Sequence, residues 1–251
     1  MGEAKLNPLL RYPVVLFDLG STLIYFDGDW LQTTQKGLEA LVQTLLHAGL
    51  KLEAVTFQAQ LQTRLEAYFT RREDDLIEHT TGANLRNLLA EWGYPDPPQS
   101  LVQDALQAMY QVSEEYWKIE PESQPALEVL RQQGYRLGLI SNAADDANVQ
   151  RLVGQTGLRS YFDVILTSAA LGIRKPHPRI FQSALATWHA APSQAVMVGD
   201  TLSADIQGAQ NQGIFSVWIT RRVAPLDTPV IQPGAVLENV GELPHLLHSL
   251  R

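Results

Sequence analysis

The sequence predicts an α/β fold: a doubly wound parallel sheet with an all-α domain inserted after its first strand. Five short apolar runs end in small or polar residues, as strands buried on both faces of a sheet do. Helical patterns separate the last four runs, which is typical of a parallel sheet covered by helices on both sides. The strands are predicted at residues 14–18, 135–141, 162–168, 195–200 and 214–219, and the helices between them at 123–133, 145–156, 178–189 and 204–212.

Glycines and the C-terminal segment complete this pattern. Gly134, Gly157 and Gly213 each follow a helical segment, at the position where many helices end in a left-handed residue. Beyond the last of the five strands, residues 234–251 predict a short strand and a closing helix.

Residues 28–118 differ in composition from the rest, being rich in Leu, Gln, Ala and Glu and poor in β-branched runs. This predicts an all-α domain of residues 28–118, with residues 1–27 and 119–251 forming the core domain. Breaks fall near Gly49 and Gly82. Four helices are predicted near residues 30–48, 54–71, 80–92 and 99–117.

Two features of the insertion have ordinary structural interpretations. Trp30, Trp92 and Trp117 fall in its helical patterns and are predicted to pack in its own core. The run of charges at residues 71–75, RREDD, is predicted to be a solvated helix end. Neither feature by itself indicates a functional site.

The composition excludes several classes of function. Hydrophobic residues make up 45% of the 251 residues and charged residues 18%, as in a globular protein. The net charge of −8 argues against nucleic acid as a partner, since a basic excess is missing. Without cysteine the chain has no disulfide, thiolate metal site or cysteine nucleophile. No signal peptide and no apolar run of about 20 residues is evident, so we expect a cytoplasmic protein without a membrane partner.

Polar residues follow the predicted strands where each strand ends. In open parallel sheets, ligands bind outside the carboxyl ends of the strands, at the point where the strand order reverses. We therefore expect these side chains to lie at one edge of the sheet, facing the helical insertion. They are Asp18, Ser141, Ser168 and Asp200.

Three aspartates are candidate metal ligands. Asp205 lies about one turn beyond Asp200, and Asp18 joins them if the two strands are neighbours. Three converging carboxylates repel one another unless a cation lies among them. Oxygen ligands without His or Cys favour a hard ion such as Mg²⁺. Taken alone, Asp18 is better explained as a turn or helix cap, and Asp200 and Asp205 as a helix cap and a solvated helix face.

Two further segments offer groups for an anion. Ser141 and Asn142 place a hydroxyl, an amide and backbone N–H groups at a helix start. Lys175 precedes Pro176 in a loop stiffened by proline, which limits where its ammonium points. Taken singly, the first pair is also a simple cap and the lysine a solvated side chain.

The motifs FDLGSTL, LISN, RKPHPRIF and VGDTLSAD occur in this order on the predicted strands and loops. With them the chain resembles the haloacid dehalogenase (HAD) superfamily over nearly its whole length, with a Rossmann-like core and a helical cap after the first strand. The resemblance implies that Asp18 is a nucleophile that forms an aspartyl-phosphate. It also implies that Ser141 and Asn142 hold the phosphoryl oxygens and that Lys175 neutralises charge.

The resemblance further implies a cofactor and a substrate class. Asp18, the backbone carbonyl of Gly20, Asp200 and Asp205 would hold Mg²⁺. The activity would be that of a phosphatase on a small phosphorylated metabolite, carried out by a monomer or homodimer. The cap would close over the site and select the substrate, with residues 24–30 as its hinge.

Gly20 departs from the family pattern. Phosphatases of this family usually carry an aspartate two residues after the nucleophile, which protonates the leaving group. Glycine cannot transfer a proton, and losing a general acid costs about 10²–10⁴ in rate. The loss is expected to matter most for alkoxide leaving groups, unless Asp27 or Asp29 replaces the missing acid.

Three other interpretations stay open. Haloacid-cleaving members carry a bulky residue at this position and lack the acidic fourth motif, so Asp200 and Asp205 disfavour that reaction. Phosphonoacetaldehyde-cleaving members carry a small residue there and use a cap lysine, for which Lys36 or Lys51 would be the candidate. The third is a binding or scaffold protein that has lost turnover.

Overall fold

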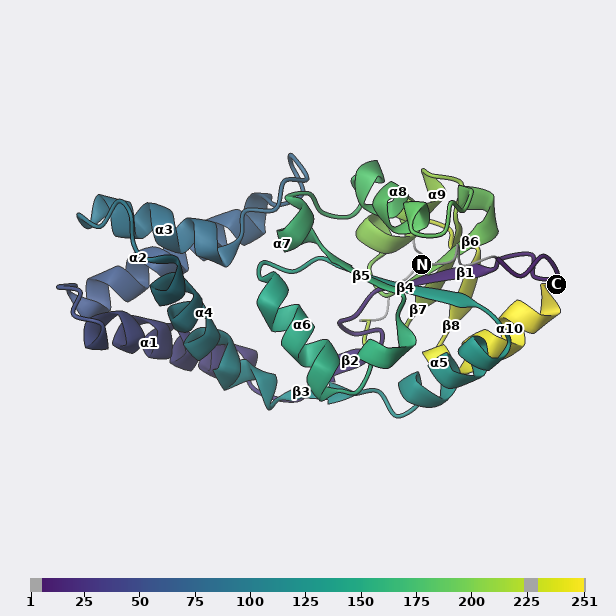
Figure 1. Cartoon of the computed structure of the whole chain (residues 1–251), viewed down its shortest axis with the longest axis horizontal. Coiled ribbons are helices and arrows are strands. Elements are labelled where there is room, and N and C mark those ends of the chain that lie inside the picture. Colours follow the sequence, from purple (N-terminus) through teal and green to yellow (C-terminus); the bar gives the residue numbers. More distant parts are fainter. Residues whose placement is uncertain (1–5, 224–229, 251) are drawn as a thin grey trace.

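Six parallel strands form the main sheet of the computed structural model, which describes residues 6–223 and 230–250. Their order is β5-β4-β1-β6-β7-β8, so the chain first adds strands on one side of β1 and then on the other. Figure 1 shows this sheet beside a separate group of helices. The strands are β1 (Val14–Phe17), β4 (Arg136–Ser141), β5 (Val164–Thr167), β6 (Ala195–Gly199), β7 (Phe215–Ile219) and β8 (Ala235–Leu237).

Helices cover both faces of the sheet, which confirms the predicted doubly wound α/β fold. Alternate side chains of β1 point to opposite faces, as the period of a strand requires. Val15 and Phe17 belong to the hydrophobic core on the face of α5 (Ser123–Gln132), α6 (Asp146–Gln155) and α10 (Leu243–Ser249). Val14 and Leu16 belong to the core under α8 (Pro178–Ala186) and α9 (Gly208–Gln210).

Four helices between β2 and β3 share a hydrophobic core of their own. They are α1 (Trp30–His47), α2 (Ala54–Arg71), α3 (Thr81–Glu91) and α4 (Gln99–Glu114). Leu41, Leu61 and Leu88 are completely buried in this core. Trp92 packs against this core, as predicted, and its ring lies edge-on to that of Phe57. None of the described helices is both long enough and apolar enough to span a membrane.

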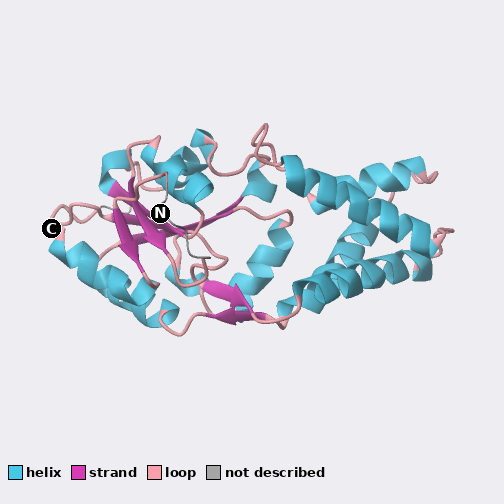
Figure 2. Ribbon diagram, turned by 180° about the vertical axis from the view of Figure 1, so that it is seen from behind, coloured by secondary structure: helices cyan, strands magenta, loops and turns pink. Residues whose placement is uncertain are grey.

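A short antiparallel pair connects the two parts of the chain, and the sequence did not predict it. Strands β2 (Ile24–Phe26) and β3 (Trp117–Ile119) pair with each other, so the helix predicted over 99–117 ends at Glu114. Figure 2 shows this pair between the main sheet and the helices. The sequence pattern does not predict this pair of strands, because each strand is stabilised by pairing with residues about 90 positions away in the chain.

The tryptophans at this connection correct a second prediction. Trp30 is 58% exposed at the start of α1, and its ring lies edge-on to those of Phe26 and Trp117. Trp117 packs against the core of the main sheet. Both residues therefore belong to the connection and not to the helical core.

The remaining elements are short. The predicted strand over 162–168 stops at Thr167, and Ser168 begins the helix α7 (Ser168–Leu171). The helix predicted over 204–212 begins earlier, as a π-helix at Leu202–Gln207 that α9 continues. Single turns of 3₁₀-helix occur at Arg159–Tyr161, Pro192–Gln194 and Val240–Glu242.

Candidate active site

The carboxyl end of β1 lies at the point where strand order reverses, with β4 on one side and β6 on the other. A cavity of about 510 Å³ opens there. Side chains from the sheet, from the β2–β3 connection and from the segment after α2 line it. This is the position at which doubly wound sheets bind their ligands.

Asp18 follows β1 and lines this cavity. Its backbone N–H donates to the carbonyl of Val198 on β6, at 2.9 Å. The chain then turns back tightly, with Ser21 in the left-handed conformation at φ 57° and its N–H donating to the carbonyl of Ile24. The turn brings Gly20 to the cavity wall beside Asp18.

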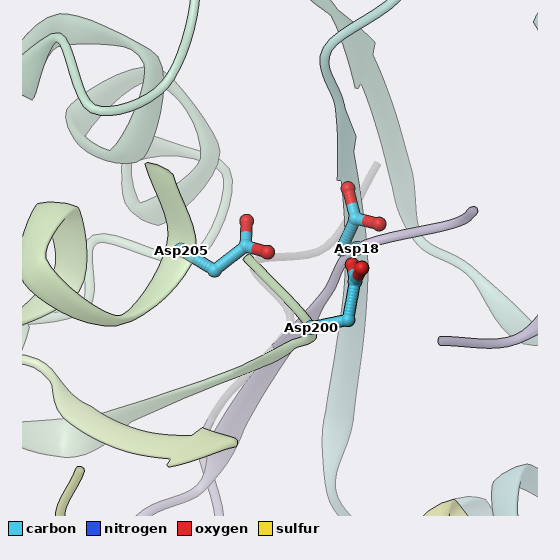
Figure 3. A group of neighbouring side chains, drawn as sticks. All are labelled: Asp18, Asp200 and Asp205. Carbon is cyan, nitrogen blue, oxygen red and sulfur yellow. The ribbon is translucent and has the colours of Figure 1, made fainter. Parts of the chain in front are cut away.

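Three carboxylates converge at this place, as the sequence predicts. Oxygen atoms of Asp18, Asp200 and Asp205 lie within 4.8 Å of one another. Figure 3 shows Asp18 and Asp200 at strand ends and Asp205 reaching toward them from its helix. The N–H of Thr201 donates to Asp205 Oδ2 at 3.0 Å and so fixes this carboxylate.

Gly199 makes room for Asp205. A Cβ atom at residue 199 would lie 2.3 Å from Asp205 Oδ2, far inside van der Waals contact. Glycine is therefore needed before Asp200 so that the π-helix can bring its aspartate against the strand end. The glycine of VGDT was the only signal of this requirement in the sequence.

Lys175 lies between two of the carboxylates and is fully buried. Its Nζ donates to Asp18 Oδ1 at 2.6 Å and to the carbonyl of Ile140 at 2.7 Å. The same ammonium forms an ion pair with Asp205 Oδ1 at 2.7 Å. Asn142 holds the lysine's backbone from both sides, since its amide accepts from Lys175 N–H at 2.8 Å and donates to Lys175 O at 2.9 Å.

Burial and the neighbouring charges shift the pKa values of the buried groups at this site. Burial raises the pKa of Asp18 to about 6, with Lys175 opposing the rise and Asp205 adding to it. Burial and the charges of Asp18 and Asp205 raise the pKa of Asp200 to about 8. Burial lowers the pKa of Lys175, but the carboxylates outweigh it and the value rises to about 12.

The donor set fits a hard divalent cation. One ammonium faces three carboxylates, so negative charge is left uncompensated. A cation such as Mg²⁺ would remove this repulsion, and carboxylate and carbonyl oxygens are the ligands it prefers. Asp18, Asp200, Asp205 and the backbone carbonyl of Gly20 are the groups available for it.

The other polar residues at strand ends lie in two different places. Ser141 ends β4, is mostly buried and lines the cavity together with Asn142. Ser168 follows β5 at the same edge of the sheet and faces the helical part, as expected, but it does not line the cavity. Its hydroxyl instead donates to Glu78 Oε2 at 2.7 Å, because α7 starts there and turns the residue toward the helical part.

None of the candidate substitutes for the missing acid or for a cap lysine lines the cavity. Asp29 caps α1 by accepting from the N–H of Gln32, and Asp27 is exposed. Lys36 donates to Gln32, and Lys51 is exposed. The described carboxylates that line the cavity are Asp18, Glu73, Asp200 and Asp205, and the described lysine is Lys175.

The sequence analysis missed several residues of the cavity wall. Arg72 and Glu73 line it, which corrects the prediction that the charge run is only a solvated helix end. Trp117, placed in the helical core by its pattern, lines it as well. A charge run has no local feature that tells which of its members the tertiary structure turns toward a cavity.

A buried polar cluster ties the helical part to the loop that carries Lys175. Arg174 Nη1 donates to the hydroxyl of Tyr68 at 2.7 Å and lies 3.4 Å from Glu78 Oε2. The Tyr68 hydroxyl donates to Glu78 Oε1 at 2.6 Å. Since Tyr68 and Glu78 belong to the helical part, the cluster holds that part against the cavity.

Comparison with known proteins adds independent findings. A family model described as haloacid dehalogenase-like hydrolase matches residues 15–219, from β1 to β7. Phosphoserine phosphatase of Thermus thermophilus is 36% identical over 125 residues, which cover 49% of this chain and 50% of the relative, about half its length. Glyceraldehyde 3-phosphate phosphatase of Methanopyrus kandleri is 29% identical over 209 residues, covering 82% of this chain and 83% of the relative. The crystal structure of 2-haloacid dehalogenase from Pseudomonas syringae matches with a TM-score of 0.70 and 29% identity, over 96% of this chain and 100% of that one.

Proposed function

Because the chain belongs to the haloacid dehalogenase-like hydrolases, we propose that it is a Mg²⁺-dependent phosphatase acting on a small phosphorylated compound. The observation that carries the proposal is the ammonium of Lys175 between Asp18 and Asp205, beside the uncompensated carboxylate of Asp200. This arrangement suits a phosphoryl group, which needs a nucleophile and several positive charges around it. Phosphatase names among the relatives support the same reaction class.

The reaction begins with attack by a carboxylate oxygen of Asp18 on phosphorus, while the bond to the leaving oxygen breaks. Lys175 holds Asp18 in place and offsets the charge of the phosphoryl group. The hydroxyl of Ser141, which has no hydrogen bond to another described residue, donates to a phosphoryl oxygen. Water then cleaves the aspartyl-phosphate, releasing inorganic phosphate and restoring the carboxylate.

Mg²⁺, held by Asp18, Asp200, Asp205 and the carbonyl of Gly20, would supply further positive charge at the phosphoryl group. The four helices α1–α4 are proposed to act as a cap of residues 28–118 that limits access of water to the cavity. Residues 24–30, part of which pairs with β3, are the proposed hinge.

Gly20 sets the preference among leaving groups. Asp27 and Asp29 do not line the cavity, so neither is in position to replace the acid absent from residue 20. With no carboxyl group at residue 20, we expect the leaving oxygen to take its proton from water. Acyl phosphates and aryl phosphates, whose leaving groups need little protonation, are expected to react faster than alkyl phosphates.

The test is Mg²⁺-dependent phosphate release from acetyl phosphate, p-nitrophenyl phosphate and glycerol phosphate. We expect turnover of the first two, a rate for glycerol phosphate lower by about 10²–10⁴, and loss of all turnover in Asp18→Asn. Removal of Mg²⁺ by a chelator is expected to abolish release. Release equal to that of Asp18→Asn on every compound would contradict the proposal and favour a binding protein.

The structural neighbour named 2-haloacid dehalogenase favours a second candidate, displacement of halide from carbon by Asp18. The cluster of Asp200 and Asp205 argues against it. These carboxylates suit a cation that offsets the charge of a phosphoryl group, and displacement of halide involves no phosphoryl group. Chloride release from 2-chloropropionate distinguishes the two, and we expect none. A phosphonoacetaldehyde-type reaction has less support, since Lys36 and Lys51 do not line the cavity.

A further inference from the structure

Glu78 belongs to the helical part of the chain, and hydrogen bonds connect its buried carboxylate to two loops of the cavity. The first loop, residues 141–144, begins at the end of β4 and provides the hydroxyl and the amide at the cavity wall. The second loop, residues 172–175, ends in the lysine that binds Asp18. We propose that Glu78 is a positioning residue that holds both loops in their places at Asp18. This inference rests on the proposed phosphatase function and adds a residue to it.

Three donors converge on the carboxylate of Glu78. The hydroxyl of Ser168 donates to Oε2 at 2.7 Å, and the hydroxyl of Tyr68 donates to Oε1 at 2.6 Å. Arg174 Nη1 lies 3.4 Å from Oε2. All three donor residues are buried, as Glu78 is. An ionised carboxylate accepts from all of them at once, whereas an amide in its place offers only one acceptor oxygen.

Ser168 connects the carboxylate to the first loop. Its hydroxyl oxygen accepts from the N–H of Ala143 at 2.9 Å. The hydroxyl proton has two acceptors in reach, the carboxylate of Glu78 at 2.7 Å and the carbonyl of Ala143 at 3.2 Å. The nearer acceptor is charged, so it takes the proton and leaves the oxygen lone pairs for the loop N–H. Ala143 directly follows Asn142, and the contact therefore fixes the backbone beside groups that line the cavity.

Arg174 connects the carboxylate to the second loop, because Lys175 is the next residue. The backbones pair here as well. The N–H of Glu78 donates to the carbonyl of Gly172 at 3.1 Å, and the N–H of Arg174 donates to that of Leu76 at 3.0 Å. Leu76 is in the left-handed conformation, at φ 59°, which a leucine keeps only where its surroundings hold it. The segment that carries Glu78 is thus held against this loop.

Asn142 joins the two loops to each other at a second place. Its amide accepts from the N–H of Lys175 and donates to the carbonyl of the same residue. A single connection lets two loops rotate about it, and a second connection through Glu78 fixes their relative orientation. Ser141 and Lys175 must face the same phosphoryl group, so loosening one connection is expected to slow the chemical step.

Glu114 supplies a matched control. It is also a buried carboxylate of the helical part, and it accepts from Arg151 Nε at 2.6 Å and from Gln155 Nε2 at 3.1 Å. Both partners belong to α6 and to neither loop, and neither is among the described residues that line the cavity. Glu78→Gln and Glu114→Gln therefore remove the same charge from the boundary between helices and sheet, with little change in size.

The experiment measures kcat and KM for p-nitrophenyl phosphate at a temperature where each variant is fully folded. Glu78→Gln is expected to lower kcat by about 10- to 100-fold and to leave KM within about threefold, because the loops carry groups that act on the transition state. Ser168→Ala is expected to do the same. The double variant should lose no more than the weaker single variant, since both residues act through one chain of contacts. Glu114→Gln should keep kcat within about threefold of the unmodified protein.

Hydrogen exchange gives a readout that does not depend on turnover. The N–H of Ala143 is expected to exchange at least about tenfold faster in Glu78→Gln and in Ser168→Ala than in the unmodified protein. In Glu114→Gln its rate of exchange should not change.

Three results would overturn the inference. Equal kcat and equal exchange rates in Glu78→Gln and Glu114→Gln would mean that Glu78 acts only on stability. Losses of kcat that multiply in the double variant would mean that Ser168 and Glu78 act separately. Turnover by the unmodified protein that Glu78→Gln retains would reject the positioning role while the phosphatase function stands, whereas no turnover by the unmodified protein would reject both.

Discussion

Gly20 lines the cavity beside Asp18, and its surroundings leave space for a side chain. A Cβ atom there would meet only the ring of Trp117, at 3.8 and 3.9 Å, which is ordinary van der Waals contact. Its φ lies outside the left-handed region, so other residues fit the backbone. Glycine at this position is therefore not required by packing or by backbone strain.

Substitution of Gly20→Asp is predicted to raise kcat for glycerol phosphate by about 10²-fold, because a carboxyl group there can protonate the leaving oxygen. The rate for p-nitrophenyl phosphate should change little. Steady-state kinetics on both compounds check this, with Gly20→Asn as a variant of equal size that cannot act as an acid. Equal gains in the two variants would show that proton transfer is not the cause.

Buried charges at the boundary between helices and sheet lead to a prediction about stability. The side chains of Glu78 and Arg174 are only 1% and 7% exposed. Substitution of Glu78→Ala leaves the guanidinium unpaired and is predicted to lower the free energy of unfolding by about 3–5 kcal/mol. Urea denaturation measures the free energy of unfolding, and the double variant with Arg174→Met should recover part of the stability lost in Glu78→Ala. A decrease in the free energy of unfolding smaller than about 0.5 kcal/mol would show that the cluster does not stabilise the fold.

At the scale of elements, the join between β6 and the π-helix controls where Asp205 lies. Substitution of Gly199→Ala places a methyl group 2.3 Å from Asp205 Oδ2, so this carboxylate must move. We predict at least a tenfold loss of Mg²⁺ affinity, measured by calorimetry, since one of three carboxylates is displaced. Gly154→Ala is the matched control, because a Cβ there has no atom within 4 Å. Equal affinity in both variants would exclude Asp205 from the metal site.

The whole molecule is expected to lose stability as pH rises when no metal is bound. The folded-state pKa values of Asp18 and Asp200 are about 6 and about 8, above the value near 3.9 of an unfolded aspartate. The folded protein thus binds more protons than the unfolded chain, and its stability falls between about pH 4 and about pH 8. Lys175, whose pKa is raised to about 12, adds stability that is lost only above about pH 10.5.

Mg²⁺ is therefore predicted to raise the Tm more at about pH 8 than at about pH 5, because at the higher pH it relieves repulsion between ionised carboxylates. Thermal unfolding with Mg²⁺ and with a chelator measures the difference. Asp200→Asn should reduce the difference between the Mg²⁺ effects at the two pH values, since that variant carries one carboxylate fewer. A Mg²⁺ effect that is the same at both pH values would contradict this account.

The sequence by itself determined the doubly wound sheet and several of the polar residues that line the cavity. Apolar runs, helical periods and glycines at helix ends are local signals, and strand ends of a parallel sheet necessarily meet at one edge. For that reason Asp18, Ser141, Lys175, Asp200 and Asp205 could be named before their positions were known. Their roles in catalysis remain a prediction.

Only the tertiary structure decided what forms the rest of the cavity wall. The pairing of β2 with β3 brings Trp117 to Gly20, and the fold of the helical part brings Arg72 and Glu73 to the cavity. Arg71 and Asp74 line a second hollow, to which Arg72 also contributes. These contacts join residues that are far apart in the chain, and the sequence of one segment does not indicate which other segment it contacts. Local sequence patterns indicate whether a segment forms a helix, a strand or a turn. The cavity wall depends instead on which of these segments contact one another in the folded protein.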